Sequence, residues 1–431
     1  MIDAAESEAA LDARFGITDL QPATGSSASK LSSCAGAVGF DEAMVRLRSL
    51  ASPLGTETVP IQRAGRRVLA APVVAALDSP RWDVAAMDGY AVADRYLDGS
   101  AARFTLTGEA SPGAPPGRAL CDFEAMRIFT GARLPDGADR VVMQELAEQR
   151  GAFVDIPPQV SPKRHVRLRG SDFQAGDILV PAGRIVDAWT MVASAAADAA
   201  ELTVFRRPRV AIIASGDELA APGMARASLE CVPEALTEAL VLLARQAGAK
   251  PGNVSIVSDR LDRILAQAEH DIERCDVLVF VGGASVGKHD LSKAALRRRG
   301  LEFCFPSVKM KPGKPVWHGC VGATHVLGLP GNPTAAMTAA RLFLTPLLHG
   351  LGGRGFDDAS KWSLVPTAES ISEGADRDLF LCASLGAESV RVLDRQEASS
   401  QIMLVNANAL VRRRPGALPA RAGELVEVMR L

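Results

Sequence analysis

The sequence predicts a multidomain fold of the α/β plus β class. It combines a doubly wound α/β domain, a β-rich inserted domain, an α+β linking domain and a small C-terminal β-barrel. Between residues 206 and 350, apolar runs typical of buried parallel strands alternate with amphipathic helical segments. Short apolar strands separated by Pro- and Gly-rich turns occupy residues 76–155 and resume after residue 355. The chain has 431 residues, more than one compact core usually organises.

The first half of the chain divides by composition into three parts. Residues 1–35 are rich in Ala, Ser and Asp with weak apolar periodicity, so we expect a disordered extension. Residues 36–75 and 156–205 are predicted to form one elongated linking domain. The β-rich residues 76–155 are predicted to form a domain inserted into it.

Two helices are expected within the linking domain. Apolar residues recur at helical spacing from Phe40 onward, and Asp41 is placed to cap that helix. A second helical pattern covers roughly residues 187–200.

In the α/β domain, residues 206–350, helical patterns follow the predicted strands. Buried strands are expected at Val210–Ala214, 254–257 and Val277–Val281. Parallel strands end at the same edge of a sheet, so the loops after them should lie together and form the ligand site. Residues 355–431 contain the short strands of the predicted C-terminal β-barrel.

Composition excludes several classes of function. The net charge is −2, so no overall basic field favours nucleic acid or an anionic membrane. We find no apolar stretch long enough to span a bilayer and no evident signal peptide, and we expect a cytoplasmic protein. The seven cysteines form no CxxC pair, so buried free thiols are expected rather than a disulfide framework or a zinc site.

Glycine-rich and lysine-bearing loops follow the predicted strands, and they suit a phosphate group. Backbone N–H groups of such loops can cradle an anion, lysines supply point charges, and glycines permit close approach. A second loop, LPGNP, enters a helix, where unpaired N–H groups also favour an anion. Each motif alone could be an ordinary turn. The candidate phosphate-binding residues are Gly282, Gly283, Ser285, Gly287, Lys311, Pro312, Gly313, Lys314, Pro330, Gly331, Asn332 and Pro333.

Acidic residues stand beside these loops. The strand at Val210–Ala214 runs into Ser215, Gly216 and Asp217, where the carboxylate can hold a divalent ion or a ligand hydroxyl. Asp217 could equally cap a helix in a polar turn. Asp290, after the GGASVG loop, could bind magnesium or serve only as a cap.

Upstream motifs in the β-rich part are less specific by themselves. Asp83 and Asp88 flank a small-residue turn, and Thr130 lies in the segment IFTGA. Chemistry alone favours a structural turn for the first of these motifs.

Taken together in this order, the motifs resemble those of the molybdopterin molybdenumtransferase family, whose eukaryotic members include the E domain of gephyrin. The resemblance covers about residues 40–431. The motifs that carry it are AMDGYAV (86–92), IFTGARLPDGADRVVMQE (128–145), SGDEL (215–219), GGASVG (282–287), KPGKP (311–315) and GLPGNP (328–333).

The resemblance implies a reaction and an assembly. Members of the family insert molybdenum from molybdate into adenylylated molybdopterin and release AMP, assisted by a divalent cation such as Mg²⁺. The family assembles as an elongated homodimer with its active site in a cleft between protomers. By the matched motifs, Asp83, Asp88, Thr130 and Asp290 would be catalytic, and Asp290 and Asp217 would hold the metal. The α/β loops would bind the substrate.

The chain departs from the family pattern at several polar positions. Val84 and Ala85 replace a usual Asn-Ser pair, and Ser171 replaces an acid. A Tyr-Asp-Ser/Thr-Asn segment is shortened at 230–233, and Lys288 stands where an acid is usual. Two alternatives therefore stay open: an impaired paralogue that binds the pterin nucleotide or a partner protein, and, more weakly, a molybdopterin adenylyltransferase-like activity.

Overall fold

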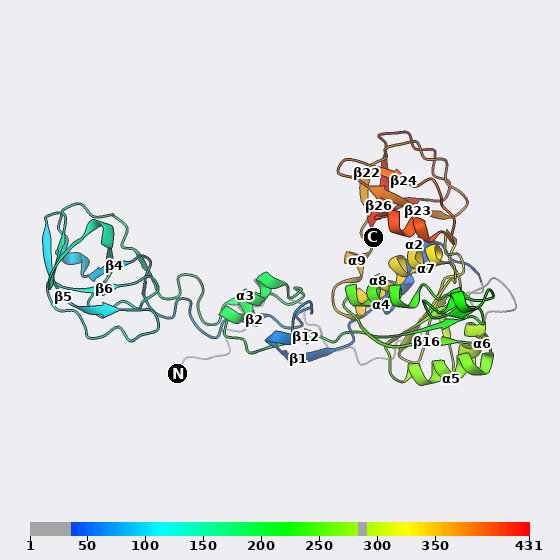
Figure 1. Cartoon of the computed structure of the whole chain (residues 1–431), viewed down its shortest axis with the longest axis horizontal. Helices are drawn as coiled ribbons and strands as arrows, with labels where there is room; N and C mark the ends of the chain where they lie inside the picture. Colours follow the sequence, from blue (N-terminus) through cyan, green and yellow to red (C-terminus); the bar gives the residue numbers. More distant parts are fainter. Residues whose placement is uncertain (1–35, 283–290) are drawn as a thin grey trace, which may run out of the picture.

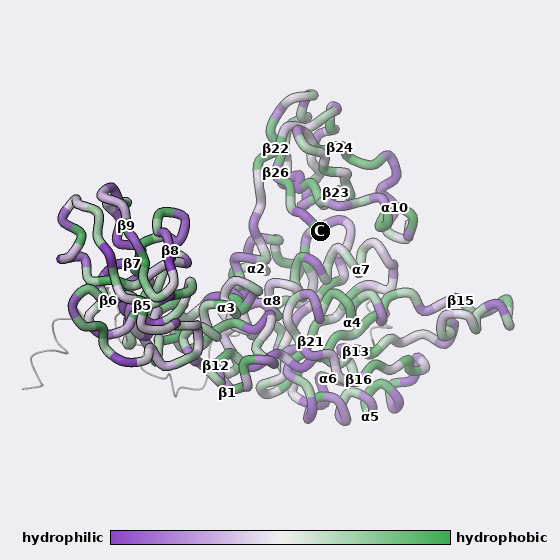
Figure 2. Tube along the Cα trace, turned by 60° about the vertical axis from the view of Figure 1, so that its left-hand side comes forward, coloured by the Kyte–Doolittle hydropathy of each residue, from purple (hydrophilic) through white to green (hydrophobic). Residues whose placement is uncertain are grey.

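The computed structural model describes residues 36–282 and 291–431. These residues form an elongated molecule, with a β-rich part at one end, an α/β part with a C-terminal β part at the other, and a thin linking part between them (Figure 1). The view of Figure 2, turned about the vertical axis, also shows the β-rich part standing apart from the α/β part. No helix in the described ranges has the length and apolar character needed to cross a membrane.

The β-rich part is built on a six-stranded sheet in the order β7-β4-β6-β5-β9-β8. Side chains of these strands alternate between two apolar clusters, as expected of strands covered on both faces. The strands of this part are β3 (Val84–Ala85), β4 (Gly89–Val92), β5 (Ala102–Ala110), β6 (Glu124–Ile128), β7 (Arg140–Met143), β8 (Glu148–Arg150) and β9 (Phe153–Ile156).

The linking part pairs segments that are far apart in the sequence. Strand β1 pairs with β12, β2 with β11, and β3 with β10, so the chain leaves this part for the β-rich sheet and then returns. The elements are β1 (Thr56–Pro60), β2 (Val73–Val74), β10 (Val166–Arg167), β11 (Ile178–Val180), α3 (Ala188–Ala196) and β12 (Glu201–Phe205). Helix α3 is shorter than predicted, and its N-cap is Asp187, whose carboxylate accepts the N–H of Thr190.

Helix α2 (Phe40–Leu50) differs from the prediction in two respects. Its buried residues Phe40, Ala43 and Leu47 pack into the core of the α/β part and not into the linking part. Its N-cap is Gly39, so the predicted cap by Asp41 is wrong. Asp41 instead forms ion pairs with two arginines of the C-terminal part. Helical spacing predicted the apolar face of α2, but only the tertiary fold decides which core covers it.

The α/β part contains a six-stranded sheet in the order β16-β13-β17-β21-β20-β18. The first four strands are parallel to one another, and β20 pairs antiparallel with both β21 and β18. Helices α4, α7 and α8 share the core on one face, and α5 and α6 that on the other, which confirms the doubly wound fold.

The strands of this part are β13 (Arg209–Ser215), β14 (Leu219–Ala220), β15 (Val232–Pro233), β16 (Lys250–Val257), β17 (Val277–Val281), β18 (Glu302–Phe305), β20 (Trp317–Val321) and β21 (Thr324–Leu329). The helices are α4 (Thr237–Gln246), α5 (Leu261–Ile272), α6 (Leu291–Arg297), α7 (Pro333–Ala339), α8 (Thr345–Leu351) and α9 (Phe356–Ala359). Helix α7 continues into α8 through a π-helical turn over Ala340–Leu344.

The C-terminal part is a closed β structure, as predicted. Its strands pair in the order β19-β23-β25-β26-β22, and β24 pairs with β23. A bridge between Thr367 and Val390 joins the end of β22 to β24, so the paired strands form a closed ring. The elements are β19 (Met310–Lys311), β22 (Ser363–Pro366), β23 (Asp378–Leu385), β24 (Val390–Val392), α10 (Gln401–Asn406), β25 (Ala409–Arg413) and β26 (Leu425–Arg430).

Candidate active site

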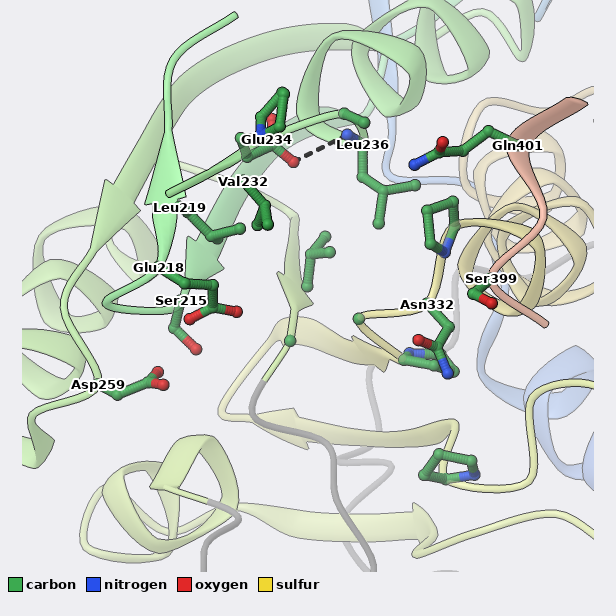
Figure 3. Close-up of a pocket in the computed structure, with 18 residues that line it drawn as sticks. Ser215, Glu218, Leu219, Val232, Glu234, Leu236, Asp259, Asn332, Ser399 and Gln401 are labelled. Atoms are coloured by element: carbon green, nitrogen blue, oxygen red, sulfur yellow. Dashed lines mark hydrogen bonds between the residues drawn. The ribbon is translucent and has the colours of Figure 1, made fainter. Parts of the chain in front are cut away.

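A pocket of about 850 Å³ lies where the parallel strands of the α/β sheet end (Figure 3). The loops after β13, β17 and β21 form its floor, the segment around β15 forms one wall, and the chain before α10 closes another. Its lining comprises Ser215, Glu218, Leu219, Val232, Pro233, Glu234, Ala235, Leu236, Asp259, Val281, Gly282, Pro315, Pro330, Gly331, Asn332, Pro333, Ser399 and Gln401. The predicted residues Ser215, Gly282 and Pro330–Pro333 thus come together, as parallel strand ends require.

The floor depends on glycines that let backbone segments approach closely. Gly282 has φ +83°, and a Cβ there would lie 2.6 Å from the carbonyl oxygen of Ser215. A side chain at 282 would therefore collide with backbone that cannot move aside. Gly331 lies next to it, since a Cβ at 331 would be 3.6 Å from the Cα of Gly282.

Carboxylates gather on the β13 and β16 side of the pocket. Burial and the nearby charges of Asp217 and Glu218 raise the pKa of Asp259, although a hydrogen bond with Ser215 opposes them. The Asp217 carboxylate accepts the backbone N–H of Asp259 at 3.2 Å, so Asp217 ties two strand ends together and does not cap a helix. These carboxylates repel one another, and a bound cation would reduce that repulsion.

Glu234 lines the same pocket, but its carboxylate is already engaged in hydrogen bonds within the protein. Its side chain, in a residue only 4% exposed, accepts the N–H groups of Leu236 at 2.8 Å and Thr237 at 3.1 Å, and also the Thr237 hydroxyl. It therefore satisfies the unpaired N–H groups at the start of α4. Glu234 shapes the wall and is not free to bind a metal.

The backbone N–H groups at the start of α7 are not free, contrary to our prediction. We predicted free N–H groups after Asn332, yet Thr334 and Ala335 donate theirs to the carbonyl of Ala398 at 3.0 and 3.3 Å. The Thr334 hydroxyl also donates to the carbonyl of Ser400 at 2.7 Å. The segment before α10 folds over this helix start, a contact between distant parts of the chain that no local motif reveals.

The KPGKP loop lies beside the pocket but reaches it only through Pro315. Lys311 and Lys314 are exposed, whereas Gly313 is buried with φ +103°. Backbone bonds from Val308 to Lys314 and from Val316 to Gly313 fix the turn. Because the lysine side chains are exposed, they remain available to a phosphate held at the mouth of the pocket.

The upstream residues lie in a different place. Asp83 accepts the backbone N–H of Arg169 at 2.7 Å, and Asp88 accepts two hydrogen bonds from Thr130. The β4–β6 region that carries Asp88 and Thr130 is at the opposite end of the molecule from the α/β sheet (Figure 1). One chain therefore does not bring these residues to the pocket.

A second pocket, of about 840 Å³, opens on the β-rich sheet close to Asp88. Arg127 lines it and also helps lower the pKa of Asp88, after the two hydrogen bonds from Thr130. The guanidinium of Arg127 lies 5.1 Å from the ring centre of Tyr90, which lines the same pocket. This surface combines the guanidinium of Arg127, the carboxylate of Glu109 and the amide groups of Gln144 and Gln149, so it suits a polar ligand.

Four of the predicted residues, Gly283, Ser285, Gly287 and Asp290, fall in 283–290, outside the described residues. Conversely, sequence reasoning missed Asp259, Glu234, Ser399 and Gln401 as lining residues. Asp259 stands two residues after the strand at 254–257, so its position near a strand end was a usable signal. Ser399 and Gln401 come from the C-terminal part, and only the tertiary fold brings them there.

Comparison with known proteins defines the family. Two family models match: the MoeA N-terminal region (domain I and II) over residues 38–197, and the probable molybdopterin binding domain over residues 211–350. A molybdopterin molybdenumtransferase of Nostoc sp. is 34% identical over 349 residues, covering 78% of each chain. Molybdopterin molybdenumtransferase 2 of Mycobacterium tuberculosis is 31% identical over 86% of this chain and 94% of that protein.

A solved structure supports the same assignment. The molybdopterin biosynthesis MoeA protein of Pyrococcus horikoshii superposes with a TM-score of 0.79 at 25% identity, covering 92% of this chain and 99% of that one. The protein belongs to the molybdopterin molybdenumtransferase family. The resemblance drawn from the six motifs is confirmed.

Proposed function

We propose that this protein is an active molybdopterin molybdenumtransferase, which transfers molybdenum from molybdate into adenylylated molybdopterin and releases AMP. The observation that carries the proposal is the polar pocket at the strand ends of the α/β sheet. Its volume of about 850 Å³ lies in the range of sites for nucleotide-sized ligands. Ser215, the Gly282–Gly331 floor and Asn332 would hold the nucleotide.

The charges around the pocket suit cleavage of a phosphoanhydride. Lys311 and Lys314 are exposed beside the pocket and can neutralise phosphate oxygens. Glu218 and Asp259 line the opposite side, where a bound phosphate would be repelled unless a divalent cation stood between them. The donor set therefore fits Mg²⁺, with Asp217 supporting Asp259 and with Asp290 as a further candidate ligand. The cation would supply charge neutralisation at the phosphates.

The homodimer is part of the proposal, because the upstream residues do not reach this pocket within one chain. A twofold assembly would place the β-rich part of one protomer, with Asp83, Asp88 and Thr130, against the α/β pocket of its partner. The second pocket near Arg127 would then face the substrate from the other side.

The direct test measures AMP released from adenylylated molybdopterin by the purified protein with molybdate and Mg²⁺. Lys311→Ala should lower molybdate-dependent release by about 100- to 1,000-fold. Lys309→Ala, which removes an exposed lysine two residues away, should leave it unchanged. Tight binding of the nucleotide without AMP release by the unaltered protein would sink the proposal and favour an impaired paralogue.

The shared site can be tested by complementation. Asp88→Asn and Lys311→Ala chains carrying different tags would be co-expressed and purified through both tags. If each site uses two protomers, the mixed dimer keeps one of its two sites intact and recovers about half of the activity. If each site lies within one protomer, both sites carry a defect and the mixed dimer stays inactive.

A further inference from the structure

Three metal-binding side chains converge on one face of the β20–β21 hairpin, away from the proposed active site. His318 and Cys320 are two residues apart on β20, and His325 lies opposite Cys320 on β21. The Nε2 of His318 is 3.2 Å from the Nδ1 of His325, and the Sγ of Cys320 is 3.8 Å from the same nitrogen. The three ligand atoms all lie within 4.8 Å of one another.

The two separations that involve the Nδ1 of His325 match the geometry of zinc. Zinc bonds of about 2.0–2.1 Å to nitrogen and 2.3 Å to sulfur, at tetrahedral angles, place two nitrogens about 3.3 Å apart. The same geometry places nitrogen and sulfur about 3.6 Å apart. The observed distances of 3.2 and 3.8 Å differ from these values by about 0.1–0.2 Å.

The chemistry of the cluster agrees with its geometry. His318 is fully buried and His325 is 7% exposed. Imidazole nitrogen and cysteine sulfur are ligands that zinc prefers in proteins. Neutral imidazoles keep the lone pairs that a metal needs.

A further thiol and two carboxylates belong to the surroundings of the cluster. Cys304 lies at an irregularity in β18 and shares the core cluster on this face of the sheet. Glu302 pairs across the strands with Cys320, and Asp276 favours a positive charge near His325. Both carboxylates would favour a cation here.

We propose that His318, Cys320 and His325 bind one zinc ion, with Cys304 or a water molecule as the fourth ligand. Sequence spacing argued against a zinc site, because these residues follow no known motif and are brought together only by the hairpin. On binding, the Cys320 thiol loses its proton to solvent and its sulfur bonds to zinc, without any change of oxidation state. The ion would fasten β18, β20 and β21 at the antiparallel edge of the sheet.

The test uses the full-length protein and needs no activity assay. Metal analysis of protein purified from zinc-supplemented medium should find one zinc per chain. After chelation, Co²⁺ should give intense visible bands of a tetrahedral site and a thiolate-to-cobalt charge-transfer band. Because this spectrum is measured on the unaltered protein, it stays informative even if variants fold poorly.

Variants then assign the ligands. Cys320→Ala and His325→Gln should each weaken zinc binding by at least about 100-fold and abolish or change the cobalt spectrum. The matched control is Cys275→Ala, which removes a buried thiol from the core on the other face of the same sheet. Unaltered protein that acquires no zinc and shows no thiolate–cobalt band would overturn the proposal, as would full binding by a folded Cys320→Ala variant.

Discussion

The Asp88 carboxylate accepts two hydrogen bonds from Thr130, one from its backbone N–H at 2.8 Å and one from its hydroxyl at 2.7 Å. These bonds, the backbone one first, lower the pKa of Asp88 below 3.8, and Arg127 adds to the effect. The pair joins two of the motifs that identified the family. It also fixes the orientation of a predicted catalytic carboxylate before any substrate arrives.

Replacing Thr130 by Val should raise the pKa of Asp88, because the hydroxyl bond to the ionised form is lost. A lowered carboxyl pKa contributes stability above the unfolded value, and this is lost as the pH falls through the folded value. In the variant the loss should therefore be smaller and should be complete at a higher pH, closer to 3.8. Carboxyl-carbon NMR titration would measure the shift. Thr130→Ser keeps the hydroxyl, and an equal shift in that variant would contradict the assignment.

Asp259→Asn should stabilise the protein without Mg²⁺ and weaken its binding of Mg²⁺. A raised carboxyl pKa means that the ionised form is disfavoured in the folded state, so its destabilising effect develops as the pH rises above 3.8. At neutral pH the variant should melt higher, by an amount on the order of 1 °C. It should also lose most of the stabilisation that Mg²⁺ gives the unaltered protein.

The matched control for Asp259 is Asp262→Asn, in the first turn of α5. Asp262 pairs with Arg260 at 3.1 Å, and hydrogen bonding to that arginine lowers its pKa. Neutralising it should not raise the melting temperature or alter the Mg²⁺ effect. A Mg²⁺ effect that survives in Asp259→Asn would place the cation elsewhere.

Thr334→Val should loosen the C-terminal part from the start of α7. Thr334 is 1% exposed and its hydroxyl donates to the Ser400 carbonyl, so the variant leaves that carbonyl short of a donor. We expect a loss of about 1–2 kcal/mol in the free energy of unfolding. Denaturant unfolding would measure it. Thr334→Ser should stay within about 0.5 kcal/mol of the unaltered protein, and an equal loss in both variants would point to packing instead.

Asp378→Ala should destabilise the protein strongly, because it leaves a buried guanidinium without its partner. The side chains of Arg412 and Asp378 are 3% and 5% exposed and lie 2.7 Å apart. Removing one member of such a pair costs about 3–5 kcal/mol. Asp41 also reaches Arg412, at 2.8 Å, and should recover part of that loss.

The control for the buried pair is Asp376→Ala, which breaks the nearby exposed pair with Arg377. That change should alter the free energy of unfolding by less than about 0.5 kcal/mol. Denaturant unfolding would measure both changes. Equal losses of unfolding free energy from the two substitutions would contradict the prediction that the buried pair stabilises the protein more than the exposed pair.

The sequence by itself determined the local structure and the family. Apolar runs predicted the strands at Val210–Ala214 and Val277–Val281, because a strand buried on both faces is apolar at successive positions and not at alternate ones. The strand-end rule then predicted that Ser215, Gly282 and Asn332 would share one site. Such patterns depend only on residues close together in the sequence, so they can be recognised without knowledge of the tertiary structure.

Only the tertiary structure decided what distant segments do to one another. It packed α2 against the α/β core, covered the start of α7 with Ala398, and separated Asp88 from the pocket by the length of the molecule. It also brought His318, Cys320 and His325 together across a hairpin. Such contacts depend on which surfaces bury one another, and a sequence pattern records only that a surface is apolar or polar, not what covers it.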